Sequence, residues 1–261
     1  MLPIERLSVI TDIVQQRHSI QISELEEILG VSHSTVYRDI LKLKKQGILT
    51  INSGVVSAIQ ISLVSSRQEI NYSAHMLLQM ERIASLASTL IDDVDSIFIG
   101  EGLICYCLAQ KIAETHRLHS LTVVTNNFNV AKVLSSVTKH LYLIGGAVLQ
   151  NSENIYTGGP KFESNLNTIF VNKAFTSVDG VDFKAGYTMQ DLSQLNILSQ
   201  LPSFCSCSIF LATSNKFGQR AIHQLAPLDF AHVIITDDNL SKSNEYVFSK
   251  IAKPKLMIAT K

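Results

Sequence analysis

Apolar residues recur at helical spacing over the first sixty positions and predict three consecutive helices. The inward positions of the first helix are Leu7, Ile10, Ile13 and Val14. The second helix is expected to open with a capping box at Ser23–Glu26, with Ser23 as its N-cap, and to continue to Leu29. Gly30 follows as a helix-ending residue, and a tight turn leads on to the third helix.

The third helix is predicted to start at Ser32, a favourable N-cap, and to end near Gln46, just before Gly47. Its inward positions are Val36, Ile40 and Leu43. Two short apolar runs, 48–51 and 55–56, then flank Asn52-Ser53-Gly54, which is typical of a β-hairpin with turn residues at its tip. Three helices followed by a hairpin indicate a winged helix-turn-helix.

Charge indicates which of these helices contacts DNA. The whole chain is balanced, with 22 basic and 22 acidic residues, but the third helix has several basic residues and only Asp39 as an acid. In a helix-turn-helix the second helix of the motif enters the major groove, so this helix is expected to bind double-stranded operator DNA. The alternative is a basic, solvated helix face of a partner-binding domain, which agrees less well with the predicted caps, turn and hairpin.

Residues near the start of the third helix are candidates for base contacts, and the later lysines are candidates for phosphate contacts. Arg38 could read a guanine with two hydrogen bonds or clamp a phosphate, and the sequence leaves both open. The candidate DNA-binding residues are His33, Ser34, Thr35, Tyr37, Arg38, Lys42, Lys44 and Lys45.

The remainder of the chain predicts a second, larger domain. Residues 58–73 lack a long helical stripe and are expected to link a DNA-binding domain at 1–57 to an α/β domain at 74–261. That domain should begin with a helix from Ala74 to about Ile91. Beyond it, short apolar strands alternate with helical segments, which favours a largely parallel, Rossmann-like sheet covered by helices. Ligands of such sheets bind in the loops at the carboxyl ends of the strands.

The predicted strands are Ser96–Gly100, Leu121–Thr125, Leu141–Ile144, Ala174–Val178, Ile209–Ala212, Val233–Thr236 and Leu256–Ala259. The helical segments between them include Leu103–Ala113, Phe128–Val137 and Tyr246–Ala252.

Composition narrows the class of protein. Hydrophobic residues make up 46% and charged residues 17%, as in a folded globular protein. No apolar run reaches the roughly 18 residues of a membrane span, and the first residues lack a signal-peptide layout, so a cytoplasmic protein without membrane contact is expected. Four cysteines form two Cys-X-Cys pairs, Cys105/Cys107 and Cys205/Cys207. Without a CxxC motif or clustered histidines, small buried hydrophobes are expected here, and no metal, disulfide or cofactor.

The segment Ser32–Ile40 (SHSTVYRDI), followed by Gly47-Ile48-Leu49, resembles the DNA-binding segment of the DeoR family of sugar-metabolism regulators. The family usually has a second Arg where Tyr37 stands, and a basic Gly-Gly wing where Asn52-Ser53-Gly54 stands. Loop segments of the large domain also match the family in order and spacing. They are Val124-Thr125-Asn126, Ile144-Gly145-Gly146, Gly159-Pro160, Asp179-Gly180-Val181-Asp182, Ser214-Asn215-Lys216-Phe217-Gly218 and Thr236-Asp237-Asp238.

The resemblance implies a regulator, most often a repressor, whose effector domain is similar to ribose-5-phosphate isomerase and typically senses a phosphorylated sugar or sugar alcohol. The family's phosphate loop places an acidic residue before Ser-Gly-Ser/Thr-Thr, so that hydroxyls and backbone N–H groups at a helix N-terminus bind the anion. This chain has Gly100-Glu101-Gly102-Leu103 there instead. Two like charges about 4 Å apart repel by roughly 4 kcal/mol at an effective dielectric near 20, so Glu101 disfavours a phosphate. Glu101 itself is expected either to cap the following helix or to point into solvent.

The segment Leu192–Leu198 also departs from the family, which usually has Glu residues and a Lys there. Asp179, Asp182 and Lys184 resemble the carboxylates and lysine of the isomerase. Catalysis is not expected, because the phosphate anchor is altered and no other positioned acid is evident. The candidate effector-binding residues are Gly100, Glu101, Gly102, Asn126, Gly145, Gly146, Asp179, Asp182, Lys184 and Lys216.

Three functions therefore remain in competition. The favoured one is a non-enzymatic repressor of a carbohydrate-metabolism operon whose carbohydrate-like effector, phosphorylated or not, has drifted from the family's usual one. The second is a regulator whose large domain only oligomerises, and the third is an isomerase-like enzyme with an added DNA-binding domain. Because one helix-turn-helix covers only a half-site, a homodimer or homotetramer is expected.

Overall fold

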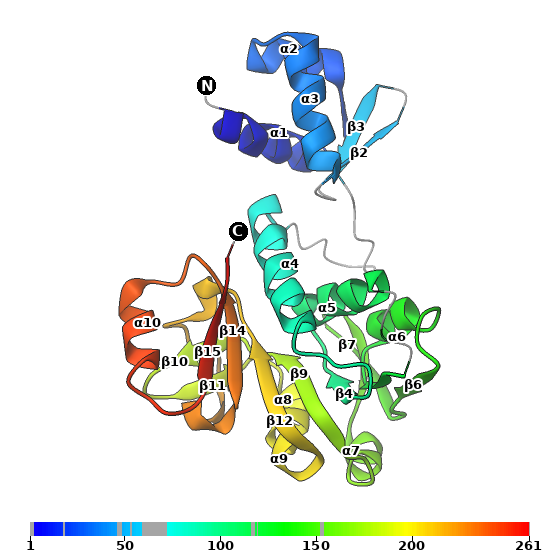
Figure 1. Cartoon of the computed structure of the whole chain (residues 1–261), viewed down its shortest axis with the longest axis vertical. Helices are drawn as coiled ribbons and strands as arrows, with labels where there is room; N and C mark the ends of the chain where they lie inside the picture. The colour runs from blue at the N-terminus through cyan, green and yellow to red at the C-terminus, as the bar shows by residue number, and fades with distance from the viewer. Residues whose placement is uncertain are drawn as a thin grey trace. The chain divides into compact units, whose positions relative to one another are not determined.

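The structure, a computed structural model, describes residues 3–17, 19–45, 49–52, 54–58, 72–115, 118, 120–151 and 154–260. They form two compact units, one holding the N-terminal helices and hairpin and one holding the chain from Gln79 onward (Figure 1). Most of the predicted connector at 58–73 lies outside the described residues, and so do Gln46, Gly47 and Ser53. The exact domain boundaries therefore stay a prediction.

In the N-terminal unit, three helices pack around one apolar core beside a small sheet. The elements are α1 (Pro3–Arg17), β1 (Ser19–Gln21), α2 (Ile22–Leu29), α3 (His33–Lys45), β2 (Leu49–Asn52) and β3 (Val55–Ala58). Strand β3 lies between β1 and β2 and is antiparallel to both. The core includes the predicted inward residues Ile10, Val14, Val36, Ile40 and Leu43. The helices and the β2–β3 hairpin confirm the winged helix-turn-helix, whereas β1 is too short to have shown a period of its own.

The start of α2 differs from the prediction. Its N-cap is Gln21, which makes no side-chain capping hydrogen bond, so the capping box with Ser23 as N-cap is wrong. The backbone N–H of Ile22 instead donates to the carbonyl oxygen of Gly54 at 3.1 Å, so the hairpin satisfies one of the free N–H groups at this helix start. Gly30 ends α2 as predicted, in the left-handed conformation at φ 62°.

The larger unit is built on a seven-stranded sheet in the order β15-β14-β12-β9-β4-β5-β6. The strands are β4 (Ser96–Ile99), β5 (Thr122–Thr125), β6 (His140–Leu143), β9 (Val171–Ser177), β12 (Cys205–Leu211), β14 (Val233–Asp237) and β15 (Lys255–Ala259). Every neighbouring pair is parallel. These are the seven strands predicted from sequence, so the Rossmann-like α/β fold is confirmed.

Helices and two small antiparallel sheets complete this unit. The helices are α4 (Ala74–Ser88), of which the part from Gln79 onward belongs to this unit, α5 (Leu103–Glu114), α6 (Phe128–Leu134), α7 (Pro160–Leu166), α8 (Leu192–Ser199), α9 (Leu201–Phe204) and α10 (Lys242–Phe248), with 3-10 turns η1 (Ser214–Lys216) and η2 (Leu228–Phe230). One small sheet pairs β7 (Ala147–Gln150) with β8 (Ile155–Gly158), and the other joins β10 (Gly180–Asp182), β11 (Gly186–Met189) and β13 (His223–Ala226). Helix α10 starts before the predicted Tyr246 because Ser241 caps it, accepting from the N–H of Asn244.

The two cysteine pairs differ in burial. Cys105 and Cys107 are buried on α5, as predicted, whereas Cys205 and Cys207 on β12 are half-buried, and no disulfide joins these four residues. Burial raises the pKa of the Cys107 thiol to about 12. Among the described residues, no three His, Cys, Asp or Glu side chains form a group that could hold a metal ion. No helix in the described ranges is long and apolar enough to cross a membrane.

Candidate functional site

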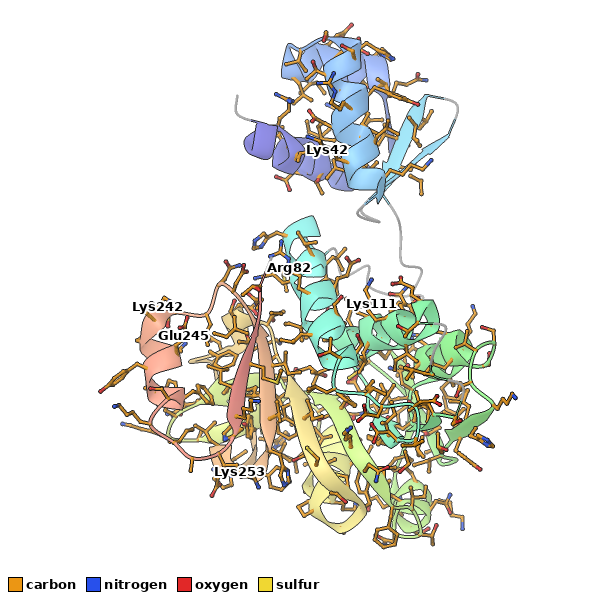
Figure 2. The ribbon with its side chains drawn as sticks, viewed as in Figure 1. Lys42, Arg82, Lys111, Lys242, Glu245 and Lys253 are labelled. Carbon is orange, nitrogen blue, oxygen red and sulfur yellow. The ribbon has the colours of Figure 1, made fainter. Side chains whose placement is uncertain are left out.

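Helix α3 presents the predicted DNA-binding residues on the face opposite its buried stripe. Val36 and Ile40 are fully buried and Leu43 is 3% exposed. Ser34, Tyr37, Arg38, Lys42 and Lys44 are exposed, as is His33, while Thr35 is half-buried. Figure 2 labels Lys42 on this helix. The side chain of Lys45 lies outside the described residues, so its place on this face is untested.

Asp39, the acidic residue of α3, does not lie on this exposed face. Asp39 is 2% exposed and accepts a hydrogen bond at its Oδ2 from Nε of Arg6 on α1, at 2.6 Å. The ion pair ties α3 to α1 and neutralises the carboxylate inside the unit. The exposed face of α3 therefore has a positive net charge, as a surface that meets phosphates requires.

His33 and Tyr37 support one another at the start of α3. The His33 ring contacts the carboxylate of Glu26 on α2 and stacks on the Tyr37 ring, with centroids 5.9 Å apart and 17° between the planes. Sequence reasoning missed the Glu26 contact because it assigned Glu26 to a capping box.

Leu41 is a further residue that sequence reasoning missed on this face. It is 41% exposed, the same fraction as Tyr37 one turn earlier. Only its position outside the i, i+4, i+7 stripe of Val36, Ile40 and Leu43 could have indicated that it faces outward.

The predicted effector residues follow the carboxyl ends of the parallel strands, and Glu101 is the most closely held of them. Its two carboxylate oxygens accept hydrogen bonds from the side-chain amides of Asn151, at 2.8 Å, and Asn154, at 3.1 Å. Its backbone carbonyl oxygen accepts from the Ser177 hydroxyl at 3.0 Å. The carboxylate therefore does not simply point into solvent, and Gly102, not Glu101, is the N-cap of α5.

The two asparagines belong to the connection between β7 and β8. Asn154 is 1% exposed, and its Oδ1 accepts from Nδ2 of Asn127 at the start of α6. Glu101 is thus part of a hydrogen-bonded group that joins the ends of β4, β5 and the β7–β8 ribbon. Nothing in the sequence placed Asn151 or Asn154 beside a residue some fifty positions earlier.

Asn126, Gly145 and Gly146 mark the same edge at β5 and β6. Asn126 is fully buried, where its backbone and amide groups bond to Thr157 of β8. Its Oδ1 has no hydrogen-bond partner among the described residues. Gly145 is exposed. Gly146 needs to be a glycine, because an added Cβ would lie 2.7 Å from the carbonyl oxygen of Gly158.

The predicted trio of Asp179, Asp182 and Lys184 is not gathered into one group. Asp179 forms an ion pair with Lys216 of η1 at 3.8 Å. Asp182 instead pairs with Arg220 at 2.9 Å, which holds the pKa of its carboxyl down at about 2. Lys184 contacts Asp182 through its backbone N–H, and the Lys184 side chain is exposed.

Two further polar groups at this edge were not predicted. The Asp191 side chain caps α8, accepting from the N–H of Ser193, and also accepts from the Tyr156 hydroxyl. Burial, with the Asp191 hydrogen bond, raises the Tyr156 pKa far above its usual value. Asp237, fully buried at the end of β14, accepts from Gln79 of α4 at 2.7 Å and from the hydroxyl of Ser214 in η1 at 2.9 Å.

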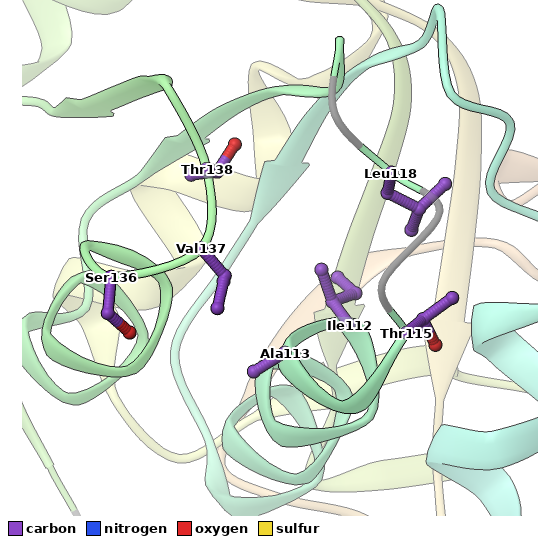
Figure 3. Close-up of a pocket in the computed structure, with 7 residues that line it drawn as sticks. All are labelled: Ile112, Ala113, Thr115, Leu118, Ser136, Val137 and Thr138. Atoms are coloured by element: carbon purple, nitrogen blue, oxygen red, sulfur yellow. The ribbon is translucent and has the colours of Figure 1, made fainter.

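A pocket of about 200 Å³ lies elsewhere, near the amino ends of β5 and β6 (Figure 3). It is lined by Ile112, Ala113, Thr115, Leu118, Ser136, Val137 and Thr138. None of the predicted effector residues contributes to it.

Comparison with known proteins covers both units. Residues 6–61 match the model of the DeoR-like helix-turn-helix domain, and residues 78–238 match the DeoR C terminal sensor domain. An uncharacterized HTH-type transcriptional regulator, YgbI of Escherichia coli, is 29% identical over 93% of both chains. The lactose phosphotransferase system repressor of Staphylococcus epidermidis is 30% identical over 95% of this chain and 97% of its own.

Among solved structures, ribose 5-phosphate isomerase from Plasmodium falciparum aligns with 53% of this chain and 52% of its own, at 12% identity and a TM-score of 0.38. The family models, in contrast, together span most of this chain and describe a DNA-binding domain and a sensor domain. The relatives are regulators, in line with the expectation that the chain is not an enzyme. The chain belongs to the DeoR family of DNA-binding transcriptional regulators.

Proposed function

We propose that this regulator is a repressor of a carbohydrate-metabolism operon and that its effector binds at the carboxyl edge of the large sheet. The observation that carries the proposal is the position of Glu101, whose carboxylate is held by Asn151 and Asn154 beside the start of α5. A carboxylate at this position suits the hydroxyl groups of a sugar and disfavours a phosphate by like-charge repulsion.

DNA recognition is assigned to the exposed face of α3. Arg38→Ala should reduce discrimination between the operator and unrelated DNA about 5- to 150-fold, the worth of one bidentate arginine–guanine contact. Lys42→Ala and Lys44→Ala should weaken binding to all sequences and reduce the salt slope by about one each. Lys242→Ala, which removes a 91% exposed basic side chain on α10, serves as the control. An Arg38 variant that footprints the operator as the wild type does would overturn its assignment.

The carbohydrate link rests on the family and on the name of the staphylococcal lactose phosphotransferase system repressor. Genome-wide mapping of bound DNA, combined with transcript levels in a deletion strain, tests it. We expect the bound site to precede genes of sugar uptake or breakdown, whose transcripts rise on deletion. Transcripts that fall would identify an activator.

The effector is proposed to be a carbohydrate without a phosphate group. Calorimetry of the wild type against paired sugars and sugar phosphates should show binding only in the unphosphorylated series. Glu101→Ser should gain affinity for the phosphorylated series, and Glu114→Ser, at the other end of α5, should not. Leu103 is best left in place, because it is 3% exposed and its replacement would disturb the core.

Tight, phosphate-dependent binding by the wild type would contradict this assignment. Absence of a thermal shift with every sugar and sugar phosphate would instead favour the alternative in which the large domain only oligomerises.

The active form is proposed to be a homodimer or homotetramer, because a single α3 covers one half-site and a two-fold protein matches a palindromic operator. Light scattering of the full chain with and without operator tests this. A monomer at micromolar concentration in both conditions would refute it.

A further inference from the structure

The exposed residues of α3 form a stripe with the spacing of a base-reading helix. Ser34, Tyr37, Arg38 and Leu41 stand at i, i+3, i+4 and i+7, and all four are exposed. With 3.6 residues per turn, this spacing places them along one line of the helix surface. The base-contacting residues of the homeodomain recognition helix follow the same spacing.

Leu41 is the apolar member of this stripe in a basic surrounding. It lies three residues after Arg38 and is followed by Lys42, and Lys44 is exposed on the same side of the helix. The carboxylate of Asp39 is turned away to Arg6. The charge of the surface around Leu41 complements a polyanion and does not suit a membrane interior or an apolar protein groove.

The major groove of DNA offers one apolar group, the 5-methyl of thymine, and aliphatic side chains of recognition helices contact it. We propose that Leu41 is a specificity-determining residue that packs against a thymine methyl in each operator half-site. The inference rests on the proposed role of α3 as the helix that enters the groove. It adds an apolar contact to the hydrogen-bonding and phosphate contacts assigned to Arg38 and the lysines.

The stacking of the His33 and Tyr37 rings favours Leu41 over Tyr37 as the side chain that contacts the thymine methyl. Tyr37 is stacked on His33, and His33 contacts Glu26. This arrangement restrains the Tyr37 ring toward the N-terminal end of α3. Leu41, one turn further on, is thereby the aliphatic group free to fill the space beside a methyl.

The test uses the full-length protein and an operator half-site obtained by selection from random double-stranded DNA. Each thymine of the half-site is replaced in turn by deoxyuridine, which removes only the methyl group. We expect one position at which the uracil replacement weakens binding of the wild type about fourfold. This is the change in affinity expected when one aliphatic carbon is no longer buried. Leu41→Ala should bind the thymine site about fourfold more weakly or worse, and should no longer distinguish thymine from uracil there.

Ile28→Ala is the matched control, because Ile28 is an apolar residue of α2 that is 45% exposed. It should bind as the wild type does and keep the methyl effect. Since Leu41 is exposed and alanine is a strong helix former, Leu41→Ala should fold normally, which its thermal unfolding checks.

The outcomes separate the two proposals. Failure of selection to enrich any sequence would count against α3 as a sequence-reading helix. Enrichment of a site at which Leu41→Ala still loses about fourfold on the same thymine-to-uracil change would overturn the role of Leu41 alone. A wild type indifferent to every uracil replacement would do the same.

Discussion

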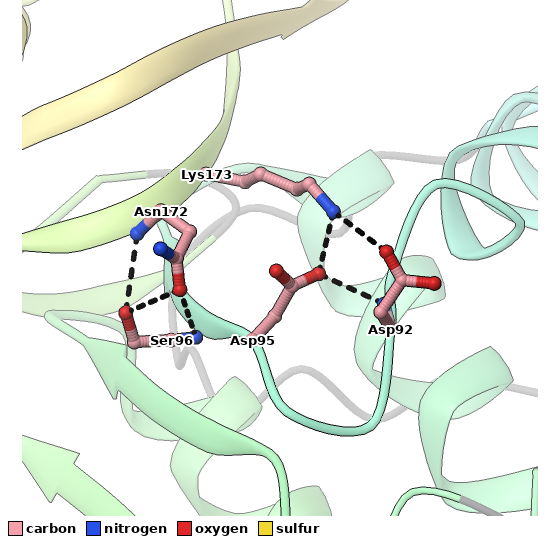
Figure 4. Close-up of polar contacts among 5 residues, drawn as sticks. All are labelled: Asp92, Asp95, Ser96, Asn172 and Lys173. Atoms are coloured by element: carbon pink, nitrogen blue, oxygen red, sulfur yellow. Dashed lines mark hydrogen bonds and ion pairs between the residues drawn. The ribbon is translucent and has the colours of Figure 1, made fainter.

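Two carboxylates, one at each edge of the seven-stranded sheet, are bound in different ways. At the amino edge, before β4 and at the start of β9, Lys173 Nζ lies 2.6 Å from Oδ2 of Asp95 and 3.3 Å from Oδ2 of Asp92 (Figure 4). At the carboxyl edge, the Glu101 carboxylate accepts from two neutral amides, those of Asn151 and Asn154. Asp95 is thus bound by a cation, whereas two amides donate to Glu101.

The contacts at the amino edge stabilise the fold. Asp95 Oδ2 also accepts from the N–H of Asp92 at 2.8 Å, and Asn172 Oδ1 accepts from both the N–H and the hydroxyl of Ser96. These contacts join β4 to β9 at their first residues. Burial lowers the pKa of Lys173, but the neighbouring carboxylates together outweigh it and raise this pKa overall. Such a group is satisfied internally and offers little to a ligand.

At Glu101, Asn151 and Asn154 hydrogen-bond the carboxylate through neutral amides. Under the proposed function, this carboxylate sets a negative potential near the start of α5, at the edge where ligands of parallel sheets bind. In the proposed effector site, the fold keeps the charged Glu101 in place so that its charge can act on the choice of ligand. Three variants test the comparison of the two edges, in decreasing order of effect.

Asp95→Ala should have the largest effect, a loss of about 3 kcal/mol in the stability of the larger unit. Asp95 is 9% exposed, and its removal deletes two hydrogen bonds, one of them to a cation, and leaves Lys173 half-buried beside a more exposed Asp92. Urea unfolding measures the loss. Lys242→Ala, which breaks an exposed i,i+3 pair with Glu245 on α10, should change the stability by less than about 0.5 kcal/mol (Figure 2). Equal losses of stability in the two variants would contradict a stabilising role for the contacts of Asp95 at the amino edge.

Asn154→Asp should have an intermediate effect that depends on pH. The change keeps the side chain's shape but sets a second carboxyl against Glu101, at a position that is 1% exposed. Burial and the like charge should raise the folded-state pKa of the new carboxyl above its unfolded value near 3.9. The variant should therefore lose little stability below that unfolded value and progressively more as pH rises through the folded-state pKa, reaching about 2 kcal/mol at neutral pH.

Unfolding at pH 5 and pH 8 measures this difference. Asn196→Asp, an exposed position on α8, is the control and should show no comparable change between the two pH values. The same loss at both pH values for Asn154→Asp would mean that charge at this edge is unimportant.

The sequence predicted the large sheet and missed most of the small strands for a physical reason. Parallel strands buried on both faces are continuous apolar runs, such as Ile97–Ile99 and Ile234–Ile235, which are visible without knowledge of their partners. Strands β7 and β10 are short, and β7 is largely exposed, so neither shows a period. The start of α2 was predicted wrongly because its N–H group is satisfied from a hairpin thirty residues away.

The candidate sites were predictable in part. Helical periodicity alone places Arg38 and Lys42 outside the buried stripe of α3, and the structure agrees. Strand order explains why Glu101 and Lys216 come to the same edge of the sheet. Hydrogen-bond partners that lie in distant loops could not be predicted, because a bond such as that from Asn154 to Glu101 produces no pattern in the local sequence.

The smallest effect is expected for a charged pair that is also exposed, Asp182 with Arg220, near the carboxyl edge. Arg220 and then the N–H of Ala185 lower the Asp182 pKa to about 2 from a usual 3.8. Because the folded-state pKa is depressed, the contribution to stability is fully present above pH 3.8 and is lost as pH falls toward 2. Arg220→Ala should raise the Asp182 pKa, yet leave it below 3.8, because the N–H groups of Lys184 and Ala185 still donate at 2.8 Å.

Carboxyl NMR titration measures this shift directly. Lys184→Ala is the matched control, since the contact that Lys184 makes with Asp182 is through its backbone N–H and survives the substitution. An Asp182 pKa that moves with Lys184→Ala as far as with Arg220→Ala would show that the lysine side chain acts on the carboxylate after all. The predicted trio of Asp179, Asp182 and Lys184 would then again be a candidate for a shared role in effector binding. A shift confined to Arg220→Ala would leave Asp182 as part of a local turn that Arg220 and the N–H groups of Lys184 and Ala185 hold together.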